Sequence, residues 1–226
     1  MRFYQVKRKS QLYDKILQKI LKGLIMYKLF IKRLLDILLS LFALIILAVP
    51  LLIFALIIKF EDKGPAFFMQ KRVGIHKTHF NIYKFRSMKM STPHDTPTHL
   101  LENPEQYILK CGRWMRKFSI DELPQIINIL KGDMSIVGPR PALWNQFDLI
   151  TERDKYGAND VRPGLTGWAQ IHGRDELSIE EKSRLDGEYV KRESFMFDVA
   201  CIFNTVAKVF THEGFVEGAE KKECFD

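Results

Sequence analysis

The sequence has few cysteines, and their placement does not suit a structural role. Cys111, Cys201 and Cys224 are odd in number and far apart, and no two of them form a CxxC pair. Disulfide frameworks and zinc sites use even or closely spaced sets of cysteines. The sequence therefore argues against both and suits the reducing conditions of the cytoplasm.

Internal repeats and low-complexity tracts are also missing. A chain of 226 residues with 46% hydrophobic and 27% charged residues can form one domain, alone or with an anchoring segment. This composition is too apolar for a disordered protein and too charged for a transporter with many spans.

Acidic residues are in short supply, which leaves a formal net charge of +8. Such a surplus indicates an acidic partner: nucleic acid, an anionic membrane surface or a phosphate-rich substrate. No recognition helix or zinc pattern for nucleic acid is present, and the charge is concentrated near the apolar segments. We therefore expect a membrane and phosphates as partners, and no nucleic acid.

The first 27 residues contain a single acid, Asp14, among many lysines and arginines. From Leu12 to Ile25 the apolar residues recur at helical spacing, with the lysines away from that stripe. We interpret residues 1–27 as a basic amphipathic extension lying on a membrane surface, where each cation gains roughly 1 kcal/mol from anionic lipid. A core helix or a partner-binding helix remains the alternative.

Charged residues are absent from residues 37–58, a run long enough to cross a bilayer as a helix. The run is too far along the chain for a signal peptide. Pro50 should kink or break the helix, and basic residues flank both ends. We therefore expect residues 28–60 to form a re-entrant helix hairpin with both ends on one side, although a spanning helix can also tolerate a proline.

Residues 61–226 are predicted to form a separate folded domain, which contains the reactive residues described below. Short strands around the turn-forming Gly74 are expected within residues 67–88, followed by a loop over 91–104. Helical patterns return from Tyr107 and then cover residues 122–131, 178–190 and 195–210. The expected fold class is α+β: a compact membrane-associated domain with a re-entrant hairpin, a small β-hairpin region and interfacial amphipathic helices.

The densest group of reactive residues lies between Ser119 and Pro141. Asp121 and Glu122 precede Pro124, which is tolerated only in the first turn of a helix. A helix N-terminus favours ionised carboxylates, as a nucleophile or a magnesium ligand requires, and can hold a phosphate. The alternative is that Ser119 or Asp121 is merely an N-cap.

Several arginines next to proline or glycine surround this acid pair. Arg140 lies in the sequence GPRP, Arg162 lies in VRPGLTGWAQ, and Arg116 precedes the acid pair by a few residues. An arginine guanidinium can bind a phosphate group through two parallel N–H···O hydrogen bonds. The combination indicates a pocket for a diphosphate.

The series of motifs resembles the monotopic bacterial sugar transferases, which are polyprenyl-phosphate phosphoglycosyl transferases. The resemblance covers almost the whole chain beyond the basic extension and is carried by these segments: KRLLDI, GPAFFMQKRVG, FNIYKFRSM, RKFSIDELPQIINILKGDMSIVGPRP, VRPGLTGWAQIHGR and LDGEYV. An ordered series of this kind is far more specific than one short motif.

The resemblance implies a role for each site residue. Asp121 matches a nucleophilic aspartate, and Glu122 matches its partner carboxylate, which helps to hold Mg²⁺. Arg116, Arg140, Arg162 and Asp186 match substrate-binding positions. The implied substrates are a UDP-sugar and polyprenyl phosphate, at the cytoplasmic face of the cell membrane. Relatives usually carry serine before the membrane proline, whereas this chain has Val49.

A non-catalytic membrane adaptor is the alternative to an enzyme. An adaptor would explain the basic surface and the apolar run, but it would not explain an acid pair among arginines held by proline and glycine. Assembly into a homo-oligomer is possible on this sequence.

Overall fold

The computed structural model describes residues 15, 18–19, 21–92, 104–173 and 177–211, and of 209–211 it describes the backbone alone. The predicted amphipathic extension lies largely outside this range. Residues 21–26 of it are helical. Within the described residues the chain forms helices and two small sheets, so the predicted α+β class is confirmed.

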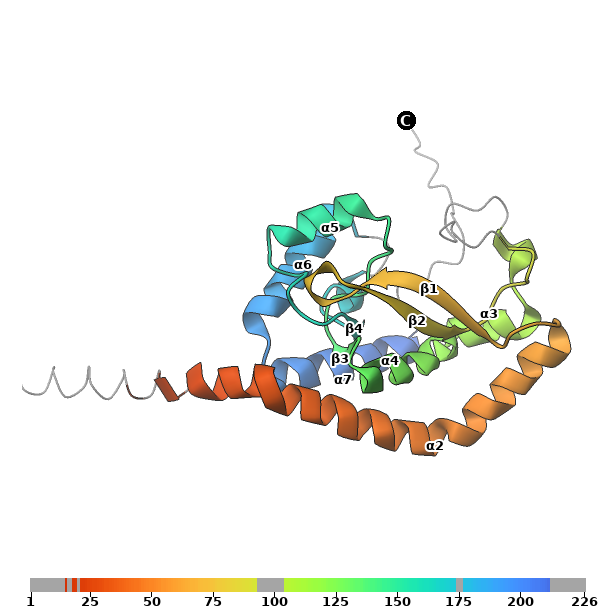
Figure 1. Cartoon of the computed structure of the whole chain (residues 1–226), viewed down its shortest axis with the longest axis horizontal. Helices are drawn as coiled ribbons and strands as arrows, with labels where there is room; N and C mark the ends of the chain where they lie inside the picture. The colour runs from red at the N-terminus through yellow and green to blue at the C-terminus, as the bar shows by residue number, and fades with distance from the viewer. Residues whose placement is uncertain (1–14, 16–17, 20, 93–103, 174–176, 212–226) are drawn as a thin grey trace, which may run out of the picture.

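One long helix dominates the N-terminal part of the structure. A π-helical turn (Tyr27–Ile31) runs without a break into α2 (Lys32–Glu61), and the stretch Leu21–Glu61 is long and apolar enough to cross a membrane. Pro50 lies inside α2, which bends near its middle (Figure 1). A proline removes one helical hydrogen bond and clashes with the preceding turn, which accounts for a bend. The apolar run therefore forms one bent helix, and not two helices joined by a turn.

Both arms of α2 pack against the same domain (Figure 1). In the first arm, the Asp36 carboxylate accepts a hydrogen bond from the backbone N–H of Ile136 at 2.9 Å. In the second arm, Ile58 is fully buried in a cluster with Phe85 and Met115. The two ends of the helix are thus attached to one folded unit.

The rest of α2 has little protein around it. Within the most apolar stretch of 18 residues in this helix, only 6% is buried inside the protein. Its exposed large apolar residues include Leu38, Leu41, Phe42, Ile45, Ile46, Val49, Leu52, Ile53 and Phe60. A soluble monomer rarely exposes a continuous apolar surface of this size, so this face requires a nonpolar environment.

The two sheets each contain two strands. β1 (Phe67–Val73) and β2 (His79–Phe85) form an antiparallel hairpin in which Phe67 lies opposite Phe85. β3 (Ser135–Val137) and β4 (Gly164–Thr166) pair in parallel. The hairpin was predicted from the sequence, whereas the parallel pair was not.

Short helices surround the sheets. The other α-helices of the described residues are α3 (Lys110–Lys117), α4 (Ile126–Lys131), α5 (Phe147–Asp154), α6 (Ile179–Arg192) and α7 (Phe195–Thr211), and short 3-10 turns lie between some of the elements. The Ser178 hydroxyl caps α6 by accepting from the backbone N–H of Glu181. Helices were expected close to α3, α4, α6 and α7, but α5 was not predicted.

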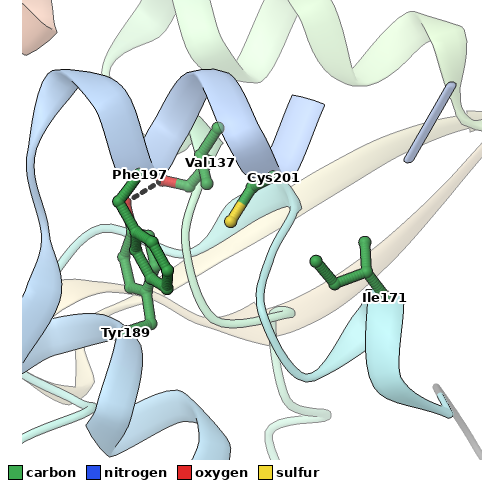
Figure 2. Close-up of a cluster of buried hydrophobic side chains, with 5 residues drawn as sticks. All are labelled: Val137, Ile171, Tyr189, Phe197 and Cys201. Atoms are coloured by element: carbon green, nitrogen blue, oxygen red, sulfur yellow. Dashed lines mark hydrogen bonds between the residues drawn. The ribbon is translucent and has the colours of Figure 1, made fainter. Parts of the chain in front are cut away.

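A core cluster joins β3 to the C-terminal helices. Figure 2 shows the cluster of Val137, Ile171, Tyr189, Phe197 and Cys201, in which the rings of Tyr189 and Phe197 lie together. The Tyr189 hydroxyl donates to the carbonyl of Val137 at 3.0 Å. This hydroxyl has a single proton, and the Asp198 carboxylate, 2.8 Å away, is its alternative acceptor. This bonding satisfies the buried phenol and fixes α6 and α7 against β3.

We predict that Gly164→Ala destabilises the domain. A Cβ at this position would lie 2.1 Å from the backbone nitrogen of Gly138, between two rigid strands. Thermal unfolding in detergent should show a loss of about 3 kcal/mol or more in the free energy of unfolding. The matched control is Gly23→Ala, because a Cβ there meets nothing within 4 Å. A Gly164→Ala protein as stable as this control would contradict the packing described for β3 and β4.

Candidate active site

The acid pair lies in a short 3-10 helix (Ile120–Gln125) that leads directly into α4. Asp121 and Glu122 occupy its first turn. Ser119 precedes it in a left-handed conformation with φ of 55°, and its side chain makes no capping hydrogen bond. The capping alternative therefore finds no support for Ser119.

Glu122 is buried between two cations. Lys84 from β2 donates to its carboxylate at 2.8 Å, and Arg140 donates to both of its oxygens, at 2.7 and 3.3 Å. Burial alone would raise the pKa of Glu122, but Arg140 and Lys84 outweigh this effect and hold the pKa well below its ordinary value. Glu122 is therefore a permanent negative charge at neutral pH.

Asp121 is half-buried and makes no hydrogen bond within the described part of the chain. Burial raises the pKa of Asp121, and the adjacent charge of Glu122 acts in the same direction, while Lys84, Arg116 and Arg140 oppose them. A carboxylate with a raised pKa is more basic and hence a better nucleophile once it is ionised. Because the Asp121 carboxylate is partly exposed and no described residue hydrogen-bonds to it, a substrate can contact it.

Lys84 was not identified from the sequence as a site residue. It lies within an apolar and aromatic stretch of β2, and burial lowers its pKa while Glu122 opposes that shift. A lysine inside such a stretch costs free energy unless it is paired, and this is the one signal that could have identified it.

The predicted substrate-binding residues lie at different distances from the acid pair. Arg140 contacts Glu122 directly, and Arg116, in the last turn of α3, is close enough to influence Asp121. Asp186 lies buried on α6 and pairs with Arg153 at 2.6 Å. The structure thus brings Arg116 and Arg140 to the acid pair. Asp186 does not contact that pair among the described residues and is connected to the Arg140 carbonyl through Arg153.

Arg162 lies at the opposite end of α4. Its Nε donates to the carbonyl of Gly132 at 3.1 Å, just beyond the last residue of that helix. Arg33 of α2 donates to the neighbouring carbonyls of Ile129 and Leu130. In this arrangement the Arg162 side chain binds the C-terminal end of α4 and, within the described residues, makes no hydrogen bond or ion pair with Asp121 or Glu122.

The carboxylates suit a magnesium ion only if a substrate supplies other ligands. Mg²⁺ is usually held by one or two carboxylates together with substrate phosphates. Asp121 and Glu122 provide two adjacent carboxylates, and the described residues contain no group of three or more His, Cys, Asp or Glu that could hold a metal ion. Both oxygens of Glu122 already accept from Lys84 or Arg140, so an ion here would rest on Asp121, on the remaining lone pairs of Glu122 and on the phosphates of a substrate.

An acid pair among basic residues, in a small domain attached to an exposed apolar helix, is the arrangement expected of an enzyme that handles phosphates at a membrane. Residues 27–212 match the family described as bacterial sugar transferase. The chain belongs to this family.

Relatives support this assignment over about four-fifths of the chain. An uncharacterized sugar transferase, EpsL of Bacillus subtilis, is 43% identical over 81% of this chain and 89% of its own length. The UDP-N-acetylgalactosamine-undecaprenyl-phosphate N-acetylgalactosaminephosphotransferase of Aeromonas hydrophila is 40% identical over 82% of this chain and 45% of its own length. The UDP-glucose:undecaprenyl-phosphate glucose-1-phosphate transferase of Escherichia coli is 38% identical, over 81% of this chain and 41% of its own length.

The chain thus spans nearly all of one of these relatives and less than half of the other two. The predicted family is confirmed, and with it the prediction of a sugar-phosphate transferase. The roles predicted for individual site residues remain predictions.

We predict that Lys84→Met reduces transfer activity by at least about tenfold. The variant removes one of the two cations on Glu122, which disturbs the charge balance around Asp121. The control is Lys77→Met at the tip of the same hairpin, where an exposed lysine pairs with Asp154. Initial rates of both variants in one assay provide the measurement. Equal rates for the two variants would remove Lys84 from the site.

Proposed function

We propose that the protein transfers a sugar 1-phosphate from a UDP-sugar to polyprenyl phosphate and releases UMP. The observation that carries this proposal is the half-buried side chain of Asp121, which no described residue hydrogen-bonds. It lies beside the ion-paired Glu122 and within the field of Lys84, Arg116 and Arg140. Such a site pairs one nucleophile with several groups that stabilise phosphate charge.

The reaction we infer has two displacements at one phosphorus. An Asp121 oxygen attacks the phosphorus that bears the sugar, and the bond from this phosphorus to the oxygen of UMP breaks. UMP leaves, and Asp121 carries the phospho-sugar as an acyl phosphate. An oxygen of polyprenyl phosphate then attacks the same phosphorus, which releases Asp121 and forms polyprenyl diphosphate sugar.

The basic residues stabilise charge during both displacements. Arg116 and Arg140 lie on either side of Asp121 in the sequence, and their electrostatic influence reaches its carboxylate. Mg²⁺ would be held by Asp121, Glu122 and substrate phosphates, and would neutralise negative charge on the diphosphate. Glu122, with its low pKa, keeps its charge throughout the cycle.

The shape of α2 supports a re-entrant arrangement. Both arms are attached to one domain, and the middle of the helix exposes apolar residues. A spanning helix would place its ends on opposite sides of a membrane, and one of them would then leave the domain. We therefore propose that α2 dips into the cytoplasmic leaflet and returns. The exposed Phe195, Met196 and Phe203 of α7 suit an interfacial helix.

For the sugar donor we propose a chemical class and not one compound. Of the three relatives described above, two have names that specify a sugar, and the sugars differ: N-acetylgalactosamine and glucose. From the motif resemblance we propose an N-acetylated hexosamine or a 6-deoxy derivative, linked to UDP. The product would start the assembly of a capsule, an exopolysaccharide or another glycan. A non-catalytic adaptor would have no need for a buried ion-paired carboxylate.

We predict that wild-type protein incubated with UDP-sugar alone becomes covalently loaded at Asp121. Intact-protein mass spectrometry should show a mass increase of one phospho-sugar, and peptide mapping should place it on Asp121. Asp121→Asn keeps the size of the side chain but lacks the nucleophilic oxygen charge, so it should show neither loading nor transfer. Wild-type rates of transfer in Asp121→Asn would rule out the covalent route.

We also predict that both ends of α2 lie on the cytoplasmic side. In a chain whose native cysteines are replaced, single cysteines at Lys28 and Lys63 should react only after the cells are permeabilised. Pro50→Leu restores the missing hydrogen bond and should favour a straight, spanning helix, which would make one position reactive from outside. Labelling of either position in intact cells that carry Pro50 would show that the helix spans.

A further inference from the structure

The segment from Gly138 to Ala142 decides where the guanidinium of Arg140 lies. Three backbone carbonyls of this segment accept hydrogen bonds of 2.8 to 3.0 Å. The N–H of Gly164 donates to the carbonyl of Pro139, the Arg72 guanidinium donates to that of Pro141, and the N–H of Val73 donates to that of Ala142. The carbonyl of Arg140 thus lies between neighbouring carbonyls that are all held by hydrogen bonds. A hydrogen bond to the Arg140 carbonyl itself completes the fixation of this main chain, whose side chain contacts Glu122.

That partner is Arg153, in the last turn of α5. Its Nη1 donates to the carbonyl of Arg140 at 3.0 Å, and its Nε donates to a carboxylate oxygen of Asp186 at 2.8 Å. Nη2 lies 2.6 Å from the same oxygen in an ion pair. A guanidinium can bind in two directions at once because its donors diverge in one rigid plane. Arg153 thus connects Asp186 to the main chain of Arg140.

The ion pair is isolated from solvent. Arg153 is 4% exposed and Asp186 is 1% exposed. Asp186 is held close to α5 because the next residue, Gly187, packs on Tyr156, where a Cβ would come within 2.5 Å of that side chain. Arg153 pairs with only one oxygen of Asp186, and the other is buried without a hydrogen-bond partner among the described residues. Because the whole carboxylate is closed off from solvent, it is poorly placed to bind a substrate directly.

We propose that Arg153 and Asp186 are positioning residues that act on the reaction through Arg140. The role rests on the proposed transfer reaction. Asp186 fixes the guanidinium of Arg153, Arg153 fixes the main chain of Arg140, and Arg140 holds its position on Glu122. Misplacing a group at a reacting centre by about 1 Å can cost about 100-fold in rate, so a remote ion pair of this kind affects catalysis without touching the substrate.

A double-mutant cycle tests this chain of contacts. Arg153→Lys keeps the positive charge, but one ammonium group cannot reproduce the forked contacts with Asp186 and Arg140. UMP release should show kcat/KM lowered about 10- to 100-fold in Arg153→Lys. In an Arg140→Lys background the same change should cost less than about threefold, because its effect passes through Arg140. Arg184→Lys, an exposed position on α6, is the control and should match the wild type.

Equal losses in the two backgrounds, or wild-type activity in Arg153→Lys, would overturn the positioning role. Asp186→Asn provides a second route, since it keeps an acceptor oxygen but removes the charge. It should change the same kinetic parameter as Arg153→Lys, with melting temperatures recorded alongside. If both variants fail to fold, the pair supports the domain as a whole and the proposal is wrong. Absence of UMP release from the wild type would contradict the proposed function, whereas additive losses would contradict only the positioning role.

Discussion

The buried carboxylate of Glu122 constrains much of the catalytic domain. A negative charge away from water is tolerated only beside compensating cations, and here they come from two other segments, Lys84 on β2 and Arg140 after β3. The hairpin, the 3-10 helix and the Gly138–Ala142 segment must therefore meet at one point. Asp121, next in sequence to Glu122, is positioned by the same convergence.

A second set of contacts attaches this site to the apolar helix. Lys32, Arg33 and Asp36 of α2 bind Asp198, the end of α4 and the backbone of β3 respectively. The KRLLDI sequence thus does more than flank an apolar run: its polar residues fasten α2 to the elements that carry the site. If α2 lies in the membrane, these contacts hold the acid pair close to the lipid headgroups. The phosphate of a polyprenyl phosphate acceptor lies at the same level, as the proposed reaction requires.

Local patterns were sufficient to predict some of this structure. The turn-forming Gly74 and the β-type residues of FNIYKF indicated β1 and β2, and helical spacing indicated α6 and α7. The motif around Asp121 and Arg140 led to the acid pair and its nearest arginine. The β3–β4 pair was missed because strands of three residues carry no periodicity. Lys84 and Arg153 were missed because their partners, Glu122 and Asp186, are far away in sequence, and the contacts exist only in the folded chain. The contact of Arg162 with the end of α4 was equally invisible to a motif.

The central claim is that Asp121 carries the phospho-sugar between two separate displacements. Isotope exchange in the absence of any acceptor lipid tests this claim most directly, because UMP can exchange into the UDP-sugar without an acceptor only if the first displacement takes place as a separate, reversible step. Purified protein incubated with radiolabelled UMP and unlabelled UDP-sugar should move label into the UDP-sugar pool, and Asp121→Asn should not. Exchange that begins only after polyprenyl phosphate is added would contradict the account, since it would mean that donor and acceptor react directly with each other.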